Sequence, residues 1–179
     1  MTPATPVLLL PGWMDSGPGH WQTRWQALHG YERVQQSDWM WPRRGDWMAR
    51  LEEVLLAHQA PTILVAHSLG CHLVAAWAAH SAHTRRVRGA LLVAPPDLDS
   101  ADTPPPVATW RPIVRQRLPF DSLLIYSEND PYCSTESAQS LALSWGCPAR
   151  SLGAAGHING ESGLGPWSEG HALMAPWRR

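Results

Sequence analysis

The sequence predicts an α/β fold, in which a compact doubly wound parallel sheet of about six strands carries helices on both faces. Two observations support this. Short apolar runs alternate along the chain with longer segments of helical character, an order typical of parallel sheets. The apolar runs are continuous rather than alternating, as expected for strands buried on both faces. With 179 residues and 44% hydrophobic residues, we expect one domain over residues 1–179.

The strand and helix candidates follow one another in a regular order. The clearest strands are residues 7–10, 62–66, 90–94 and 123–127, and weaker candidates are residues 32–36 and 149–152. Helices are predicted near residues 20–28, 47–58, 69–82, 135–145 and 168–174. A strand order 2-1-3-4-5-6 would bring the first and third strands side by side, and ligands bind at the carboxyl ends of strands at such a switch point.

The connection over residues 95–119 is rich in proline and poor in periodicity. We expect it to be a long surface connection that flanks the site. Its role is not defined by the sequence.

Charge and composition restrict the possible partners. The net charge is −1 and the pI about 6.7, so no strong field favours nucleic acid. Residues 1–12 lack the features of a signal peptide, and no apolar stretch has the length to span a membrane. The three cysteines lack metal-ligand spacing and fit reduced thiols. We therefore expect a cytoplasmic protein that binds neither nucleic acid nor membrane, with no prediction of its oligomeric state.

Ser68 is the predicted nucleophile. The third strand runs directly into a helix through His67-Ser68-Leu69-Gly70, which is the context of a nucleophile elbow in α/β-hydrolases. The expected pattern is G-x-S-x-G, and here Ala66 replaces the first glycine while Gly70 keeps the second. The alternative is that Ser68 only caps the following helix.

His157 is the predicted general base. A serine hydroxyl needs a base within hydrogen-bond reach and a third group that orients this base. The chain order in this fold is serine, acid, histidine, and His157 lies in a small-residue loop just after the last strand. His20 is the alternative base, although it precedes the serine. The other histidines considered, His58, His72, His80 and His83, fit packing or solvent positions better.

Asp130 is the predicted acid. It follows the strand at residues 123–127, and Pro131 stiffens the turn after it. Glu128 and Asp97 are the rival acids. A purely structural alternative is that Asp130 forms an Asx-turn.

Two backbone N–H groups are predicted to form an oxyanion hole. One belongs to Leu69, directly after the nucleophile and at a helix N-terminus. The other is assigned to Trp13, which follows Gly12 after the first strand, with a simple Pro-Gly turn as the alternative. Trp13, His20 and Trp21 are the candidate pocket residues, because the first third of the chain is rich in tryptophan and aromatic rings often line binding sites.

The chain resembles the small serine hydrolase family of α/β-hydrolases that includes retinoblastoma-binding protein nine and bacterial relatives. The resemblance covers nearly the whole chain. It rests on Pro11-Gly12-Trp13, Gly19-His20-Trp21, Ala66-His67-Ser68-Leu69-Gly70-Cys71, Leu118-Pro119-Phe120, Ser127-Glu128-Asn129-Asp130-Pro131-Tyr132-Cys133, Gly156-His157-Ile158-Asn159 and Ser162-Gly163-Leu164-Gly165.

The resemblance implies a compact hydrolase without a large cap domain, with Ser68, Asp130 and His157 as the catalytic triad and no cofactor. Members of the family are typically described as predicted esterases, so no physiological substrate follows. Tyr132, Cys133, Asn159 and Ser162 flank the triad, and their roles are left open.

Together these features predict a carboxylesterase that cleaves a small ester through an acyl-enzyme. Amides and thioesters are open alternatives. A different class of function is a binding protein that keeps the fold without catalysis. A metal-dependent hydrolase would require clustered His and carboxylate ligands, which the sequence does not suggest.

Overall fold

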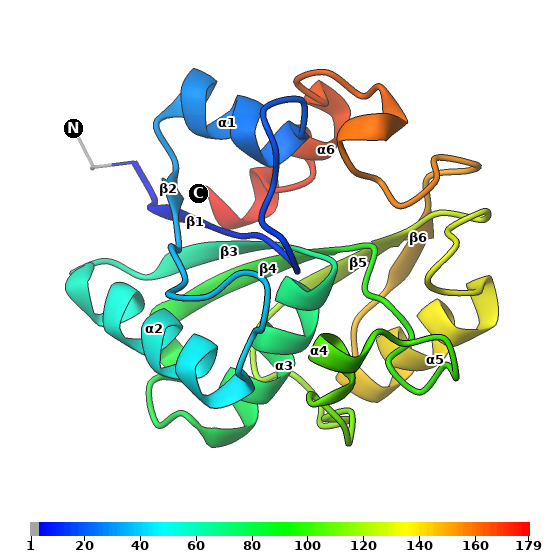
Figure 1. Ribbon diagram of the computed structural model, residues 1–179. Coiled ribbons are helices and arrows are strands. Elements are labelled where there is room, and N and C mark those ends of the chain that lie inside the picture. Colours follow the sequence, from blue (N-terminus) through cyan, green and yellow to red (C-terminus); the bar gives the residue numbers. More distant parts are fainter. Residues whose placement is uncertain (1–3) are drawn as a thin grey trace.

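The computed structural model describes residues 4–179 and contains a six-stranded sheet in the order β2-β1-β3-β4-β5-β6, with every neighbouring pair parallel (Figure 1). The predicted order is therefore confirmed. Within the described residues no large cap domain is inserted between these strands. Residues 1–3 lie outside this range. They belong to the predicted domain and to the segment, residues 1–12, in which no signal peptide is predicted.

The strands are short at the edges of the sheet and longer at its centre. They are β1 (Val7–Leu10), β2 (Glu32–Arg33), β3 (Thr62–His67), β4 (Val87–Val93), β5 (Ser122–Tyr126) and β6 (Ala149–Ser151). The continuous apolar run of β3 is buried over its whole length, as expected for a central strand covered on both sides.

Helices cover both faces of the sheet. They are α1 (Trp21–His29), α2 (Arg44–Ala57), α3 (Leu69–His80), α4 (Pro105–Ala108), α5 (Thr135–Trp145) and α6 (Ser168–Ala172). The described residues also form short 3-10 helices, which are η1 (Thr84–Arg86), η2 (Gly160–Ser162) and η3 (Ala175–Trp177). Figure 1 shows α1 and α6 on one face and α2, α3 and α5 on the other.

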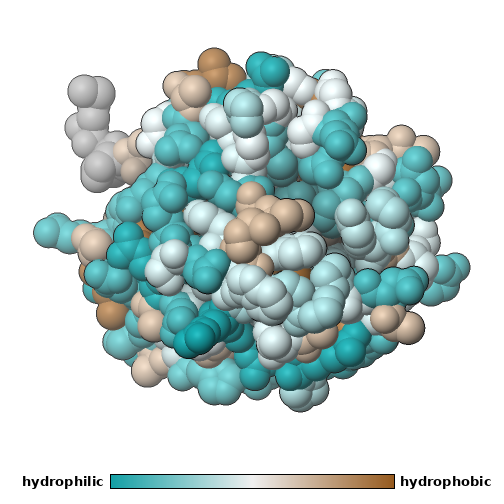
Figure 2. All heavy atoms as spheres, in the orientation of Figure 1, coloured by the Kyte–Doolittle hydropathy of each residue, from teal (hydrophilic) through white to brown (hydrophobic). Residues whose placement is uncertain are grey.

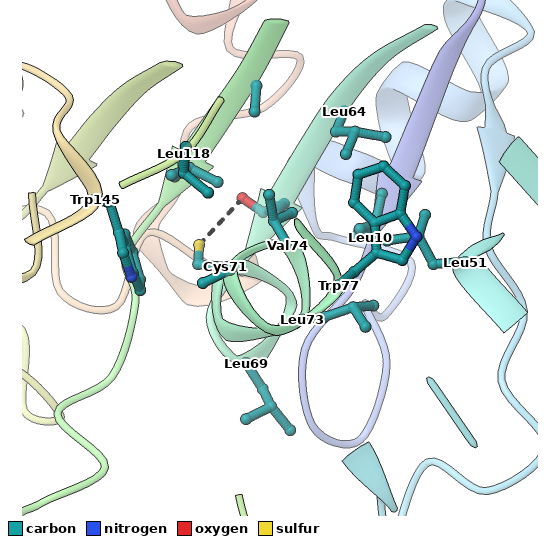
Figure 3. Close-up of a cluster of buried hydrophobic side chains, with 14 of the residues drawn as sticks. Leu10, Leu51, Leu64, Leu69, Cys71, Leu73, Val74, Trp77, Leu118 and Trp145 are labelled. Carbon is teal, nitrogen blue, oxygen red and sulfur yellow. Dashed lines mark hydrogen bonds between the residues drawn. The ribbon is translucent and has the colours of Figure 1, made fainter. Parts of the chain in front are cut away.

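Alternate strand residues supply two separate cores. Leu8 and Leu10 of β1 pack on the side of α2, α3 and α5, whereas Val7 and Leu9 pack on the side of α1 and the C-terminal segment. This division follows from the two-residue period of a strand. Figure 3 shows the first of these cores around α3, with Trp77 among the labelled side chains. Two apolar layers therefore hold the central strands, and with them the loops at their carboxyl ends.

The outer surface mixes polar and apolar residues. Hydrophilic residues predominate on the face in Figure 2, and apolar residues occur there in small groups. No helix within residues 4–179 combines the length and the hydrophobicity that crossing a bilayer requires.

Residues 95–119 lie mostly at the surface, as their composition predicts, but they also contain features that the composition does not predict. They include the short helix α4, and Trp110 is only 1% exposed. The indole N–H of Trp110 donates to the carbonyl of Pro42 at 3.0 Å, and its ring packs edge-on against Trp47 of α2. The segment is therefore a surface connection beside the site, as expected, and one large aromatic residue anchors it in the core.

Candidate active site

Ser68 lies between β3 and α3 in a strained backbone conformation. Its φ is 55° and its ψ is −124°, a left-handed φ that few residues other than glycine adopt and that costs about 1–3 kcal/mol. The turn is this tight because the strand ends at His67 and the helix begins at Leu69. The hydroxyl of Ser68 makes no capping hydrogen bond to α3, so the helix-capping alternative does not describe this side chain.

Two glycines permit the close packing around Ser68. A Cβ atom on Gly70 would collide with the carbonyl oxygen of Leu10 in β1. A Cβ on Gly12 would come within 2.8 Å of the Ser68 Cβ and 3.1 Å of the Leu69 nitrogen. Ala66, which replaces the usual first glycine, is fully buried within the sheet opposite Leu10. The backbone after β1 therefore lies directly against the turn that carries Ser68.

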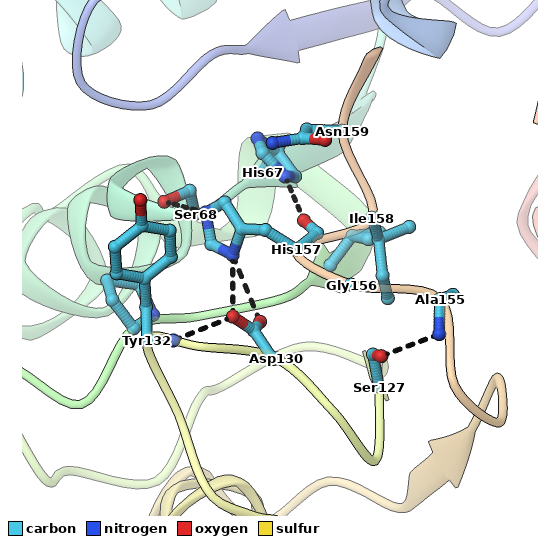
Figure 4. Close-up of polar contacts among 12 residues, drawn as sticks. His67, Ser68, Ser127, Asp130, Tyr132, Ala155, Gly156, His157, Ile158 and Asn159 are labelled. Atoms are coloured by element: carbon cyan, nitrogen blue, oxygen red, sulfur yellow. Dashed lines mark hydrogen bonds and ion pairs between the residues drawn. The ribbon is translucent and has the colours of Figure 1, made fainter. Parts of the chain in front are cut away.

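A hydrogen-bonded chain joins Ser68, His157 and Asp130 (Figure 4). The Oγ of Ser68 is 2.9 Å from Nε2 of His157. Nδ1 of the same ring is 3.1 and 3.0 Å from the two carboxylate oxygens of Asp130. A carboxylate can only accept, so Nδ1–H donates to Asp130 and Nε2 is left to accept from the Ser68 hydroxyl. The side chains of His157 and Asp130 are 11% and 3% exposed.

The loops that carry Asp130 and His157 are bound to each other. The side-chain oxygen of Asn129 accepts from the N–H of Gly156 at 2.8 Å. The hydroxyl of Ser127 donates to that oxygen. The same hydroxyl accepts from the N–H of Ala155, a contact shown in Figure 4. The turn after β5 therefore fixes the loop after β6, and with it the distance between acid and imidazole.

Asp130 also forms the Asx-turn considered as an alternative. Its Oδ1 accepts from the backbone N–H of Tyr132 at 2.9 Å. The bond to Tyr132 leaves Oδ2 directed at His157, so the turn holds the carboxylate in place and does not compete with the contact to the imidazole.

The rival acids have other partners. Glu128 accepts from the hydroxyl of Ser151 at 2.7 Å, and Asp97 accepts from the hydroxyl of Ser137 at 2.9 Å. Among the rival histidines, Nε2 of His72 is 2.8 Å from the carbonyl of Pro96. His20 does not reach Ser68 and instead contacts His67.

The candidate oxyanion donors lie on either side of the turn. Leu69 is the first residue of α3, and a first helical N–H has no partner within its helix. Its neighbour in space is Gly12, which precedes Trp13. The indole N–H of Trp13 donates to the carbonyl of Met40 at 2.9 Å, which holds this segment against the loop before α2.

A cavity of about 360 Å³ opens beside Ser68. Trp13 and His20 line this cavity, as do Leu98, Val107 and other members of the connection between β4 and β5. Trp21 does not line it, and this expectation is corrected. The Trp21 ring is 1% exposed and its N–H donates to the carbonyl of Ile158 at 2.8 Å, so it belongs to the core beneath the loop that carries His157.

The comparisons identify the family. A family model described as serine hydrolase matches residues 7–176. The chain belongs to the serine hydrolase family. The resemblance inferred from the sequence motifs is thereby confirmed at the level of the family.

Solved structures similar to this serine hydrolase share the α/β-hydrolase fold. A protein from Pectobacterium atrosepticum described as a YdeN-like hydrolase is 28% identical with a TM-score of 0.85, and the match covers 97% of this chain and 90% of that chain. The ydeN gene product of Bacillus subtilis is 18% identical with a TM-score of 0.72, covering 97% and 98%. An esterase from Rhodococcus is 17% identical with a TM-score of 0.69, covering 97% and 90%. None of the curated proteins compared with this sequence matches it.

Asn159 and Ser162, whose roles the sequence left open, stabilise the histidine loop of this serine hydrolase. The hydroxyl of Ser162 donates to the carbonyl of Ala155 at 2.6 Å and accepts from the N–H of Asn159 at 3.0 Å. The two partners of Ser162, Ala155 and Asn159, lie on either side of His157 in the chain, so the loop is closed by its own hydrogen bonds. Cys133 is a buried residue, and burial, followed by the charges of Asp130 and Asp97, raises the pKa of its thiol to about 12.

Metal ligands are not gathered at the site. Within residues 4–179 no group of three or more His, Cys, Asp or Glu side chains could hold a metal ion.

His67 is the residue at the site that sequence reasoning missed. Its ring is buried, and its Nε2 is 2.9 Å from the backbone carbonyl of His157. Its position next to Ser68 was the available signal, but a contact with a residue 90 positions away cannot be read from the elbow motif alone.

Buried neutral histidines make stability depend on pH. Burial, followed by the positive charge of Arg33, lowers the pKa of His20 to about 3. Burial lowers the pKa of His72 to about 4 and that of His67 well below its usual value. In the unfolded chain these histidines take up protons near their ordinary pKa of about 6.5, whereas in the folded chain they do so only at lower pH. The free energy of unfolding therefore falls as the pH drops from about 6.5 towards the lowered pKa values. The decrease is up to about 1.4 kcal/mol per pH unit for each histidine.

We expect the urea midpoint of unfolding to decrease clearly between about pH 7 and about pH 5, the range in which unperturbed histidines take up protons. A His72→Gln variant should show a shallower decrease, because one buried group no longer contributes. A midpoint that is constant over this range would contradict the assignment of these histidines as neutral.

Proposed function

We propose that this serine hydrolase cleaves small carboxylic esters, with Ser68 as nucleophile, His157 as general base and Asp130 as the acid that orients the base. The observation that carries the proposal is the continuous hydrogen-bonded chain from Ser68 through His157 to Asp130 beside a cavity. A neutral imidazole whose Nε2 accepts from a hydroxyl is the arrangement that acyl transfer requires.

The first half of the reaction forms an acyl-enzyme. Oγ of Ser68 attacks the ester carbonyl carbon as its proton passes to Nε2 of His157, and Asp130 stabilises the resulting imidazolium. The negative charge on the carbonyl oxygen is received by the N–H groups of Leu69 and Trp13 in this proposal. The C–O bond to the alcohol then breaks, and the alcohol leaves with the proton from His157.

The second half regenerates the enzyme. Water enters the site, His157 removes a proton from it, and the resulting hydroxide attacks the acyl carbon. The bond to Oγ breaks, Ser68 recovers its proton from His157, and a carboxylic acid is released. Neither half consumes an oxidant or a cofactor.

The size and lining of the cavity favour small substrates. A volume of about 360 Å³ is near the lower end of the range for ligand pockets, about 300–1,000 Å³. Trp13, Leu98 and Val107 offer apolar surface to an acyl or alkyl group. Similar folds include proteins described as esterases from Rhodococcus and Thermogutta terrifontis, and their descriptions agree with an ester substrate.

A fluorophosphonate probe tests the proposal directly, because it phosphonylates only an activated serine. We expect the protein to be labelled stoichiometrically, with the adduct on the peptide that contains Ser68, and a Ser68→Ala variant to remain unlabelled. A folded wild-type protein that resists the probe and hydrolyses no p-nitrophenyl ester would favour the alternative of a binding protein. A panel of p-nitrophenyl esters with increasing acyl length then defines the preferred substrate, and we expect turnover to fall once the acyl chain exceeds the cavity.

A further inference from the structure

Two buried histidines connect the start of α1 to the loop that carries His157. Nε2 of His20 is 3.3 Å from Nδ1 of His67, and Nε2 of His67 is 2.9 Å from the carbonyl oxygen of His157 (Figure 4). His20 and His67 are 4% and 5% exposed. The hydrogen bonds between Ser68, His157 and Asp130 do not use either ring.

The direction of the hydrogen bonds in this connection is fixed at both ends by the backbone. The N–H of Gln22 donates to Nδ1 of His20 at 3.1 Å, so the proton of His20 must be on Nε2. Nε2–H then donates to Nδ1 of His67, and the proton of His67 must in turn be on Nε2. This Nε2–H of His67 donates to the carbonyl of His157, which can only accept. One tautomer of each ring satisfies all three contacts.

Both rings must also be neutral. A second proton on His20 would face the N–H of Gln22, and a second proton on His67 would face Nε2–H of His20. Burial of both rings, with the positive charge of Arg33 near His20, acts in the same direction by lowering their pKa values.

The backbone that this connection holds is strained. His157 lies between Gly156 and Ile158, whose φ angles are 61° and 48°, and a β-branched residue rarely adopts a positive φ. Side chains from elsewhere in the fold bind two successive carbonyls of this loop. His67 binds the carbonyl of His157, and Trp21 donates to the carbonyl of Ile158. A loop in this conformation needs such contacts to persist.

We propose that His20 and His67 form a neutral relay of fixed tautomers that positions the backbone of His157, so that its imidazole keeps its contact with Ser68. Both are positioning residues, since their hydrogen bonds reach the backbone of His157 and neither ring is hydrogen-bonded to Ser68 or to the imidazole of His157. The inference rests on the proposed function, because positioning matters only if His157 acts on Ser68.

Two substitutions at position 67 distinguish the two hydrogen bonds of His67, the one that it donates to His157 and the one that it accepts from His20. The amide nitrogen of His67→Gln can occupy the place of Nε2 and donate to the carbonyl of His157. The shorter amide of His67→Asn reaches only the place of Nδ1, so it can pair with His20 but not with His157. We expect kcat for p-nitrophenyl acetate to fall about 10²-fold in His67→Asn and at most about tenfold in His67→Gln, with KM unchanged in both, since misplacing a catalytic group by about 1 Å costs on this order.

A third variant tests the far end of the relay. His20→Asn keeps an acceptor for the N–H of Gln22, because asparagine is a favourable N-cap residue, but it removes the contact with His67. We expect an intermediate loss of kcat and no further loss when it is combined with His67→Asn. His80→Gln is the control, because His80 also contacts a backbone carbonyl, that of Ala76 in its own helix. We expect the kcat of this variant to be unchanged.

Nitrogen NMR provides a readout that does not depend on activity. We expect His20 and His67 to show the Nε2–H tautomer, with nitrogen shifts that do not change between about pH 8 and about pH 5, a range in which free histidines titrate. An Nδ1–H tautomer or titration of either ring near neutral pH would overturn the relay. The relay would also be overturned if His67→Asn kept full activity while Ser68→Ala lost turnover. An active Ser68→Ala variant would instead overturn the proposed function.

Discussion

Replacing Ser68 by alanine is expected to lower kcat/KM for an activated ester such as p-nitrophenyl acetate by about 10⁴-fold or more, because the members of a triad act as a unit. The change removes the oxygen that we propose as the nucleophile and its contact of 2.9 Å with His157. Alanine has to adopt the same positive φ as Ser68, so the strain of the turn persists. Steady-state kinetics with purified variant and wild type measure the effect.

The control for this experiment is a serine remote from the site. Ser144 lies on α5 and its hydroxyl donates to the carbonyl of Ser140 in the same helix. We expect Ser144→Ala to keep the activity of the wild type. A Ser68→Ala variant with the same turnover as Ser144→Ala, after contaminating esterases have been excluded, would end the case for Ser68 as nucleophile.

Replacing Asp130 by asparagine is expected to lower kcat by about 10⁴-fold while the fold is kept, as loss of the orienting carboxylate does in serine proteases with a similar triad. The carboxylate of Asp130 only accepts, and it accepts from Nδ1–H of His157. An asparagine amide can present N–H groups to the ring, which favours the tautomer with its proton on Nε2. That tautomer cannot accept the proton of Ser68.

Glu128 offers a matched control for this substitution. It lies two residues before Asp130 in the same turn, but its carboxylate accepts from Ser151 and not from His157. Glu128→Gln should therefore change kcat by no more than a fewfold. Equal activities of Asp130→Asn and Glu128→Gln, measured with the same ester at several pH values, would show that Asp130 does not orient the base.

The sheet order was predictable because its evidence is local. Apolar runs such as residues 62–66 are short and continuous, and most of them are followed by a predicted helix. The right-handed crossover rule then restricts the order of strands. The turn at Ser68 was predictable for the same reason, since a strand joined to a helix with Gly70 close behind leaves few possible conformations.

Other features depend on tertiary packing and could not be predicted in this way. The contact between His20 and His67 joins residues 47 positions apart, and nothing in either segment indicates the other. Trp21 belongs to the core and not to the cavity because α1 turns this ring towards the carbonyl of Ile158. The inward position of Trp110 was likewise hidden, because the surrounding prolines indicate irregular backbone but not which side chain is buried.

The short strands at the two ends of the sheet affect how molecules of this protein meet each other. β2 has two residues and β6 three, and they carry Glu32, Arg33 and Arg150. A strand of a neighbouring molecule would find few free backbone groups there and would have to pack beside charged side chains, which is how natural sheets resist edge-to-edge aggregation. The core strands β3 and β4, rich in aliphatic residues, are enclosed on both sides, so the segments most prone to self-association stay out of reach while the protein is folded.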